Sequence, residues 1–388
     1  MKITKTNYVV PILIIAAVIG LLATASADRD IVFAAQHYRW SGKYYVDKDS
    51  HSRPEKTLDD VDTYHLYRMN PDGKNAKQIT FGNGNEFEPR WSPDGKTIAF
   101  IKADSNYGNK SLCIADERGQ HQKSLFKFTN DTKFRWSPNG RQLGILIPDW
   151  ADRANHIDRL CIIDIKTGHK QLLKYVTDFD WSPDCRKLAL WYHFQEYEYE
   201  RNVFKIVDVA SNKVIRSEDY MSEPFWISNS RILGIELPRE GTEESASLRF
   251  TDANGQSSEF EQMQYINNEG PTWSTRDEWR RVPLSGHDLI CQSYWGMSDG
   301  GHYQCYVVNW FTKLVRYLAP GRCLGVSPDG KSILAADQDW IGPYKRGGRR
   351  CGPIKLINIK TGKSRTLTGK LMSVAGGDWR KPPAKTSR

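Results

Sequence analysis

The sequence of 388 residues predicts an all-β fold, a seven-bladed β-propeller built from four-stranded antiparallel blades. Three observations predict it. The motif Arg-Trp-Ser-Pro-Asp-Gly-Lys at residues 90–96 recurs, and Trp91, Trp136, Trp181 and Trp226 are each 45 residues apart. Aromatic residues make up 12% of the chain, which suits a Trp-rich β fold. No helical periodicity is sustained for more than a turn or two, whereas a fixed repeat of this length indicates a repeat architecture.

Each repeat is interpreted as four short strands. The first strand carries the Trp and ends in Ser-Pro-Asp-Gly, where Pro presets φ, Asp bonds its own backbone and Gly supplies a positive φ. An apolar second strand follows, such as residues 98–101, and then an alternating third strand, such as residues 111–115. A hairpin turn leads to a polar fourth strand. Four antiparallel strands per repeat make a propeller blade, and the repeating Trp is interpreted as a core residue between blades.

The two ends of the chain are expected to share one blade. Residues 30–35 match the second strand of a blade, but no Trp strand precedes them. The missing first strand lies in Leu371 to Lys381, which contains Trp379. This carboxyl-terminal strand therefore joins the amino-terminal blade and closes the ring, which removes exposed sheet edges. Six further first strands lie between, among them the degenerate copies at Trp273 and Val326, and they bring the number of blades to seven.

These repeats resemble a known family. Trp-Ser-Pro-Asp-Gly-Lys at residues 91–96, the strand Ile-Ala-Phe at residues 98–100 and the short hairpin after it are similar to TolB-type propeller repeats. The resemblance covers nearly all of the chain after the leader and implies the propeller fold. It implies several functions, because such repeats occur in periplasmic scaffolds, in peptidase propeller domains and in some polysaccharide lyases. TolB itself has an additional amino-terminal domain, for which this chain has no room.

Residues 1–27 are predicted to be a secretory signal peptide, and residues 28–388 the propeller. Lys2 and Lys5 precede an apolar run from Val9 to Leu22, and small residues near Ala27 fit a cleavage site. An uncleaved anchor is the alternative, although the run is shorter than the roughly 20 residues that a spanning helix needs. No later segment is apolar enough to span a membrane. The expected location is therefore periplasmic or secreted.

The seven cysteines leave their pairing open. An exported chain can form disulfides, but spacing alone does not fix which residues pair. Cys291 and Cys305 lie in the second and third strands of the sixth blade, where they can face each other. Cys323 and Cys351 lie in the seventh blade. No cysteine or histidine spacing fits a structural zinc site.

Function is expected on one face of the ring. The connections between second and third strands share this face with the blade linkers, and in this sequence they are long and irregular. These connections are Gln36 to Thr63, Pro148 to Asp158, His193 to Arg201, Pro238 to Ala246, Trp295 to His302 and Gln338 to Pro353. We call this side the long-loop face.

Aromatic and acidic residues gather in these connections. Aromatic rings stack on sugars or peptide groups, and carboxylates accept hydrogen bonds from hydroxyl groups. The candidate ligand-binding residues are Trp40, Trp150, Trp191, His193, Trp295, Asp337, Asp339, Trp340 and Tyr344. The alternative is that these rings pack the loops onto the scaffold. The acidic runs Asp59, Asp60 and Asp62, or Asp337 and Asp339, are interpreted as solvated charges rather than a calcium site.

The leading hypothesis is an exported, non-enzymatic binding module for a protein or glycan partner in the cell envelope. No Gly-x-Ser-x-Gly elbow occurs, and no catalytic residue, metal ligand or cofactor is predicted. The alternative is a metal-dependent carbohydrate-active enzyme, since the resemblance extends to propeller oligouronide lyases. That family holds its metal in a late His/Gln cluster, whereas only His287 and His302 lie in the last two blades. Despite the net charge of +9, an exported monomer without a nucleic-acid partner is expected.

Overall fold

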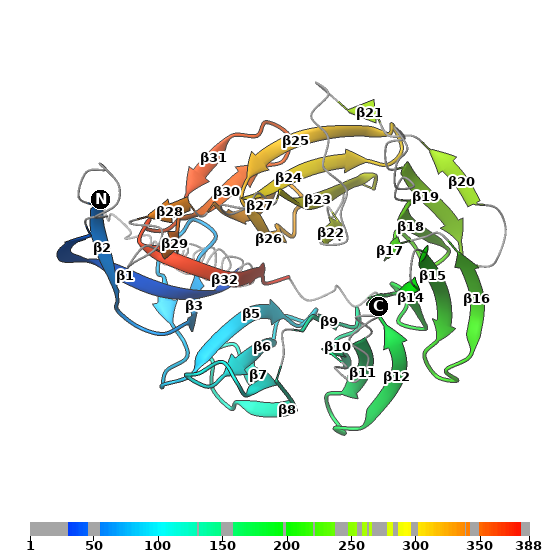
Figure 1. Cartoon of the computed structure of the whole chain (residues 1–388), viewed down its shortest axis with the longest axis horizontal. Helices are drawn as coiled ribbons and strands as arrows, with labels where there is room; N and C mark the ends of the chain where they lie inside the picture. Colours follow the sequence, from blue (N-terminus) through cyan, green and yellow to red (C-terminus); the bar gives the residue numbers. More distant parts are fainter. Residues whose placement is uncertain are drawn as a thin grey trace, which may run out of the picture.

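A computed structural model of the chain shows seven blades arranged as a ring (Figure 1). It describes residues 30–45, 55–129, 132–148, 158–196, 199–219, 222–236, 247–253, 258–261, 264–265, 278–281, 286–295, 302–337, 339–341 and 349–381. The predicted signal peptide lies outside these residues. Within them the secondary structure is β, and no helix is long and apolar enough to cross a membrane. The predicted fold class is confirmed.

The first four blades follow one another along the chain. Blade 1 contains β32 (Met372–Trp379), β1 (Ile31–Tyr45), β3 (His65–Met69) and β4 (Lys77–Gln78), and β2 (Glu55–Asp60) pairs with the far end of β1. Blade 2 contains β5 (Asn85–Trp91), β6 (Thr97–Ala103), β7 (Lys110–Asp116) and β8 (Lys123–Phe128). Blade 3 contains β9 (Phe134–Trp136), β10 (Gln142–Pro148), β11 (Asp158–Asp164) and β12 (Lys170–Val176). Blade 4 contains β13 (Asp178–Trp181), β14 (Lys187–Glu196), β15 (Tyr199–Asp208) and β16 (Val214–Asp219).

The last three blades complete the ring. Blade 5 contains β17 (Ser222–Trp226), β18 (Arg231–Glu236), β19 (Ser247–Asp252) and β20 (Ser258–Glu261). Blade 6 contains β22 (Glu278–Arg281), β23 (Asp288–Trp295), β24 (His302–Asn309) and β25 (Leu314–Pro320), with β21 (Gln264–Tyr265) added in parallel to β25. Blade 7 contains β26 (Arg322–Val326), β27 (Ser332–Ala336), β30 (Ile354–Asn358) and β31 (Ser364–Thr366), and the hairpin β28 (Asp339–Ile341) with β29 (Arg349–Cys351) extends it.

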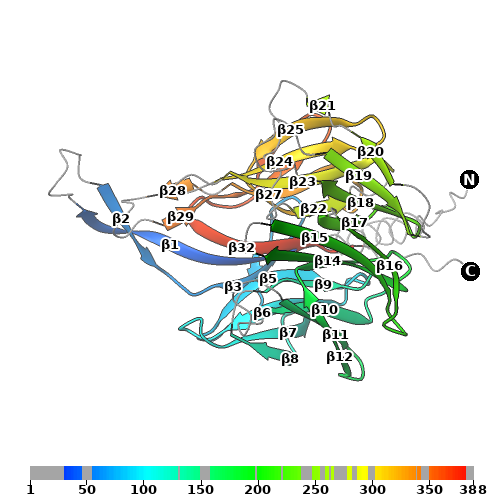
Figure 2. The same cartoon turned by 45° about the vertical axis from the view of Figure 1, so that its right-hand side comes forward.

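The carboxyl-terminal strand closes the ring as predicted. β32 pairs antiparallel with β1, from Ile31 opposite Trp379 to His37 opposite Met372, and the two strands run side by side in Figure 2. β32 is also tied to blade 2, because the Trp91 amide donates to Asp378 Oδ2 at 2.9 Å. One blade is therefore built from the two ends of the chain.

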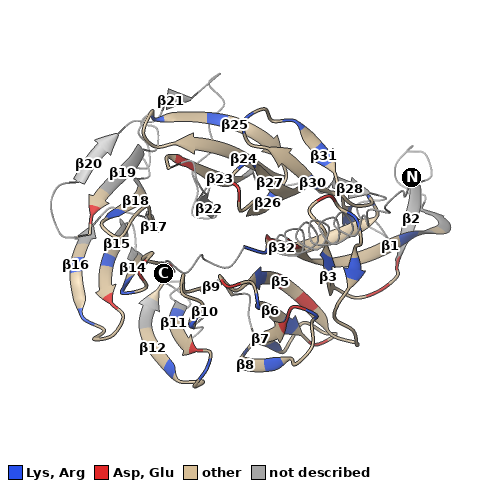
Figure 3. Cartoon of the chain, turned by 180° about the vertical axis from the view of Figure 1, so that it is seen from behind, with Lys and Arg blue, Asp and Glu red and all other residues tan. Residues whose placement is uncertain are grey.

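Ion pairs join innermost strands of different blades around the centre of the ring. A β-bulge in β5 puts Glu88 at a φ of 50°, where its carboxylate meets Arg90 at 3.0 Å and Arg322 of blade 7 at 2.6 Å. Red and blue segments accordingly share β5 in Figure 3. In blades 3 and 4, Arg135 contacts the carboxylate of Asp178. The Glu88–Arg322 pair spans from blade 2 past blade 1 to blade 7, and the Arg135–Asp178 pair joins blades 3 and 4, so both pairs help to hold the ring together.

The repeating Trp residues pack between blades, as the sequence predicts. Trp91, Trp181 and Trp379 are each 4% exposed, and Trp226 is fully buried. Trp136 is half-buried, and its Nε1 donates to Arg90 O at 3.2 Å. Each of these indoles therefore contributes to the apolar contact between blades. In blade 6 the first strand is β22 rather than the predicted strand at Trp273, which lies outside the described residues.

The Ser-Pro-Asp-Gly turns have the predicted geometry. Ser92 Oγ donates to Asp94 Oδ1 at 2.6 Å and accepts from Thr97 N at 3.0 Å, while Gly95 has a φ of 67°. In blade 4 a cysteine occupies the glycine position: Cys185 has a φ of 62°. Its Sγ accepts a hydrogen bond from Asn139 N of blade 3 at 3.3 Å, which links the two turns.

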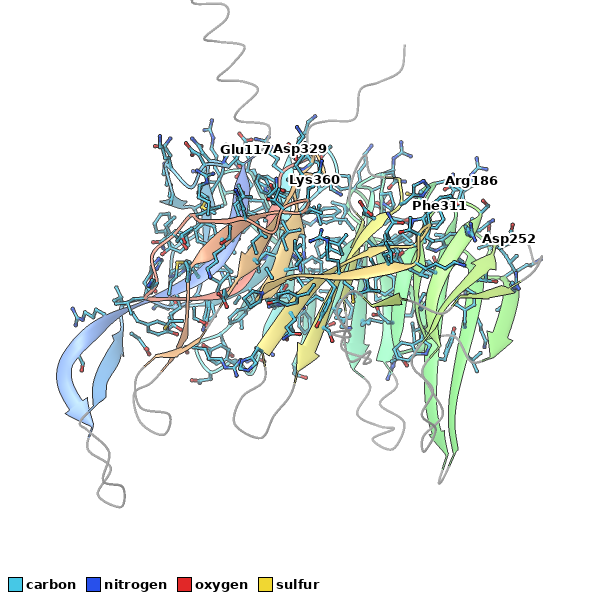
Figure 4. All side chains as sticks on the ribbon, turned by 90° about the horizontal axis from the view of Figure 1, so that it is seen from above. Glu117, Arg186, Asp252, Phe311, Asp329 and Lys360 are labelled. Atoms are coloured by element: carbon cyan, nitrogen blue, oxygen red, sulfur yellow. The ribbon has the colours of Figure 1, made fainter. Side chains whose placement is uncertain are left out.

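Three of the long connections expected to be irregular contain regular strands instead. The segment from His193 to Arg201 lies in the β14–β15 ladder, which continues to Glu196 opposite Tyr199. The first and last of the long connections carry the β1–β2 and β28–β29 hairpins. The expectation of irregular loops was wrong because aromatic and β-branched residues favour a continued ladder over a loop. In Figure 4 the β1–β2 and β14–β15 hairpins project to the side opposite the turns that carry Glu117, Arg186 and Lys360.

The suggested facing of Cys291 and Cys305 is wrong. Cys291 lies opposite Tyr306, and Cys305 lies opposite Gln292, so the two cysteines are offset by one residue. Neighbouring positions point to opposite faces of a sheet. Cys291 accordingly packs with Leu233 toward blade 5, whereas Cys305 packs with Cys323 toward blade 7. All seven cysteines are free thiols in the structure.

Candidate binding surface at the junction of blades 1 and 2

The predicted binding residues are spread over several blades. Five of them lie on described strands, but their side chains are not described: Trp40 on β1, His193 on β14, Trp295 on β23, and Asp339 and Trp340 on β28. Two more, Trp150 and Tyr344, lie entirely outside the described residues. Of the two side chains that are described, Trp191 is 2% exposed within blade 4. Asp337 pairs with Lys355 Nζ at 2.5 Å. Their binding roles therefore stay predictions.

Aromatic side chains that the sequence did not single out gather where blade 1 meets blade 2. The rings of Tyr64 and Phe87 lie 5.1 Å apart, and those of Phe87 and Tyr107 lie 5.9 Å apart in a stacked arrangement. Tyr107, in the turn between β6 and β7, is 47% exposed, and Val61 after β2 is 58% exposed. We call Val61, Tyr64, Phe87 and Tyr107 the aromatic surface. A row of contacting rings with an exposed end is a suitable platform for an apolar ligand face.

A hollow of about 500 Å³ adjoins this surface. Its walls come from the segment after β2 and from the linker between β4 and β5. The lining residues are Asp60, Val61, Asp62, Thr63, His65, Gly82 and Asn83. Because both segments belong to the long-loop face, this hollow opens where the sequence predicts function.

A hydrogen-bonded network fixes one wall of the hollow. The His37 amide donates to Asp62 Oδ1 at 2.6 Å, and His37 Nδ1 lies 3.0 Å from Asp62 Oδ2. Tyr67 OH donates to Asp62 Oδ2 at 3.1 Å. Burial and the Asp62 charge raise the pKa of Tyr67, so its hydroxyl stays protonated and remains a donor. The Asp62 carboxylate is therefore held in one orientation, as a preformed site requires.

A buried acid and base lie behind the hollow. His65 Nδ1 is 2.9 Å from Glu86 Oε2, and Glu86 is 1% exposed. Thr63 Oγ1 donates to Gly84 O and therefore accepts from His65 Nε2–H at 3.2 Å. A proton must then lie between Nδ1 and Oε2, so the pair holds one proton on either the imidazole or the carboxyl. Burial raises the pKa of Glu86, opposed by the hydrogen bond from His65 and by Lys102.

The sequence did not predict this surface because its residues are separated along the chain. Tyr64 precedes β3, Phe87 is inside β5, and Tyr107 lies in a turn with a φ of 59°. Phe87 and Tyr107 stack within blade 2, and the packing of blade 1 against blade 2 adds Tyr64 to them. Among the described residues, no group of three or more His, Cys, Asp and Glu side chains is placed to hold a metal ion.

The comparisons with known proteins identify the fold. No protein-family model and no curated protein sequence matches the chain. An oligogalacturonate lyase in complex with manganese is 15% identical over 80% of this chain and 83% of that chain, with a TM-score of 0.51. The β-propeller domain of the Trilobed protease from Pyrococcus furiosus is 16% identical over 87% and 98%, also with a TM-score of 0.51. TolB from Acinetobacter baumannii is 12% identical over 83% and 80%, with a TM-score of 0.47. At these identities the similarity concerns the fold alone, and it agrees with the β-propeller fold of the chain.

Proposed function

We propose that this protein is an exported, non-enzymatic binding module whose long-loop face recognises a protein or glycan partner. The observation that carries the proposal is the aromatic surface beside a preformed hollow at the junction of blades 1 and 2. Functional residues are concentrated in loops that a rigid scaffold positions, and the ring supplies that scaffold. Export itself rests on the amino-terminal sequence pattern.

The chemistry of the surface suits a ligand with an apolar face and hydroxyl or amide groups. Tyr107 offers an exposed ring on which a sugar face or a side chain can stack. Asp60 and Asp62 line the hollow and accept hydrogen bonds. The network of His37, Asp62 and Tyr67 is already formed, so little conformational entropy is lost on binding.

The test is a thermal-shift screen of the full chain against envelope oligosaccharides, with and without manganese. A ligand at about 100 times its Kd adds roughly 2.7 kcal/mol to the free energy of unfolding, which is a shift of several degrees. Tyr107→Ala is expected to abolish the shift. Phe311→Ala is the matched control, because Phe311 is 68% exposed and lies on the opposite face (Figure 4).

The protein arm of the test uses crosslinking in the envelope. A partner recognised by the aromatic surface is captured by the wild type and by Phe311→Ala but lost from Tyr107→Ala. Binding that does not depend on Tyr107 in either arm would contradict the proposal. A shift that requires manganese would instead support the lyase alternative predicted from the sequence.

A further inference from the structure

We propose that a second groove, between the outer turns of blades 1 and 2 on the face opposite the long-loop face, binds an extended acidic peptide segment of a partner protein. This site goes beyond the proposed function, because it lies apart from the aromatic surface and does not depend on it. The groove runs between β4 with its preceding turn on one side and the β7–β8 turn on the other. Its volume is about 750 Å³, within the usual range for ligand sites.

The floor of the groove carries charges that are already compensated. Arg68 contacts the carboxylate of Asp30, which is 4% exposed, and its Nη1 donates to Glu117 O at 3.1 Å. The Glu117 carboxylate pairs with Arg380 Nη2 at 2.7 Å. Two acidic groups therefore face two arginines, and the floor contributes no net charge.

The walls add positive charge that is not compensated. Lys77 lies on β4 of blade 1, and Arg118 lies in the β7–β8 turn of blade 2. Both side chains are exposed, and both line the groove. Within the part of the chain that the structure describes, neither side chain has an acidic partner. Cations on opposite walls of one groove select a ligand that carries negative charge.

Amide side chains supply the second recognition element. Asn70, Asn75, Gln78, Gln120 and Gln122 all line the groove. Gln78 and Gln122 are oriented by their own hydrogen bonds, from Gln78 Nε2 to Thr80 O at 2.8 Å and from Gln122 Nε2 to Gly119 O at 3.1 Å. An amide has both a donor and an acceptor, so it matches the N–H and C=O groups of a peptide backbone.

The form of the groove favours an extended peptide. β4 is the outermost strand of blade 1, so its free edge borders the groove. Blade 6 shows that an outer strand of this ring accepts an additional strand, because β21 pairs with β25. At one end of the groove Phe81 is 70% exposed and offers an apolar contact for a side chain. Addition of a strand at a sheet edge is a common mode of peptide recognition.

The test uses the full chain and an array of capped random nonapeptides. Peptides rich in Asp and Glu with a flanking apolar residue are expected to bind, with Kd then measured by fluorescence polarisation. The double variant Lys77→Glu, Arg118→Glu is expected to raise the Kd of the best acidic peptide by about tenfold or more. Lys331→Glu, Lys360→Glu is the matched control, since both residues are exposed on distant turns and the charge change is the same. Its Kd should stay near that of the wild type.

Each other outcome overturns the assignment. An equal loss in both double variants would show a response to net charge alone. Failure of every acidic peptide to bind would contradict the proposed ligand. Binding of an acidic polysaccharide that depends on Lys77 and Arg118, with no peptide bound, would indicate a different class of partner. Tyr107→Ala should leave the Kd of the acidic peptide unchanged. Failure of this groove is therefore distinguishable from failure of the long-loop face.

Discussion

Replacement of Asp378 by Ala tests how the ring is closed. Asp378 Oδ2 accepts from the Trp91 amide at 2.9 Å, across the junction between β32 and blade 2, and Trp91 is 4% exposed. Asp378→Ala leaves a buried amide without its acceptor, which costs about 2 kcal/mol. For a domain of this size that loss lowers Tm by roughly 3 °C.

An equivalent contact elsewhere in the ring provides the control. Asp180 Oδ2 accepts from the Trp226 amide at 2.9 Å between blades 4 and 5. Asp180→Ala should lower Tm by a similar amount, because the lost hydrogen bond is the same. Only Asp378→Ala should also open the closure locally, because β32 is joined to the rest of its blade by strand pairing rather than by a neighbouring chain segment.

The assay for local opening is amide hydrogen exchange in peptides that cover residues 371–381. Exchange there is expected to rise in Asp378→Ala and to stay at the wild-type rate in Asp180→Ala. An unchanged Tm in Asp378→Ala, or equal exchange of β32 in the two variants, would refute the idea that this contact holds the closure.

Three further predictions concern turns and buried charges. Cys185→Gly should raise Tm slightly, since relief of a left-handed φ gives about 1 kcal/mol and exceeds the weak hydrogen bond from Asn139 to sulfur; a clear decrease would contradict this. Burial raises the pKa of Asp178, but Arg135 and Lys133 lower it by more, so the pKa lies below the usual 3.8. Asp178 therefore contributes to stability above that pH and loses this contribution as pH falls. Asp178→Asn should accordingly flatten the acid limb of urea-unfolding curves. Burial holds the pKa of Glu86 above 4.5, so its contribution to stability decreases as pH rises above that value, and Glu86→Gln should remove this decrease from urea-unfolding curves.

The fold was predictable because each repeat encodes its own turn and its own core residue. Ser92, Asp94 and Gly95 close the turn through bonds within a few residues, so the sequence reports this geometry directly. Trp91 and Trp226 each end the first strand of their blade, directly before the turn, and both are buried. The closure by β32 followed from counting strands rather than from any contact.

Features that depend on register were not predictable in the same way. Whether Cys291 and Cys305 share a face depends on a shift of one residue in the β23–β24 ladder, which the turn between them decides. The extension of β14 and β15 likewise depends on pairing between two segments that both have polar and aromatic residues. A pattern of residue types does not fix either choice.

The aromatic surface illustrates why a site is harder to predict than a fold in this architecture. On one face of the ring, the turn side chains of successive blades are linked, as when Asp184 N donates to Asn229 Oδ1 at 2.9 Å and Asn139 N to Cys185 Sγ. These bonds tie neighbouring repeated turns to one another, although the accepting residue differs between them. On the opposite face, Val61 and Tyr107 lie in segments that are not part of this repeated turn motif. Variation is therefore tolerated there without loss of the ring, and ligand recognition can develop on that face while the repeated turns preserve the scaffold.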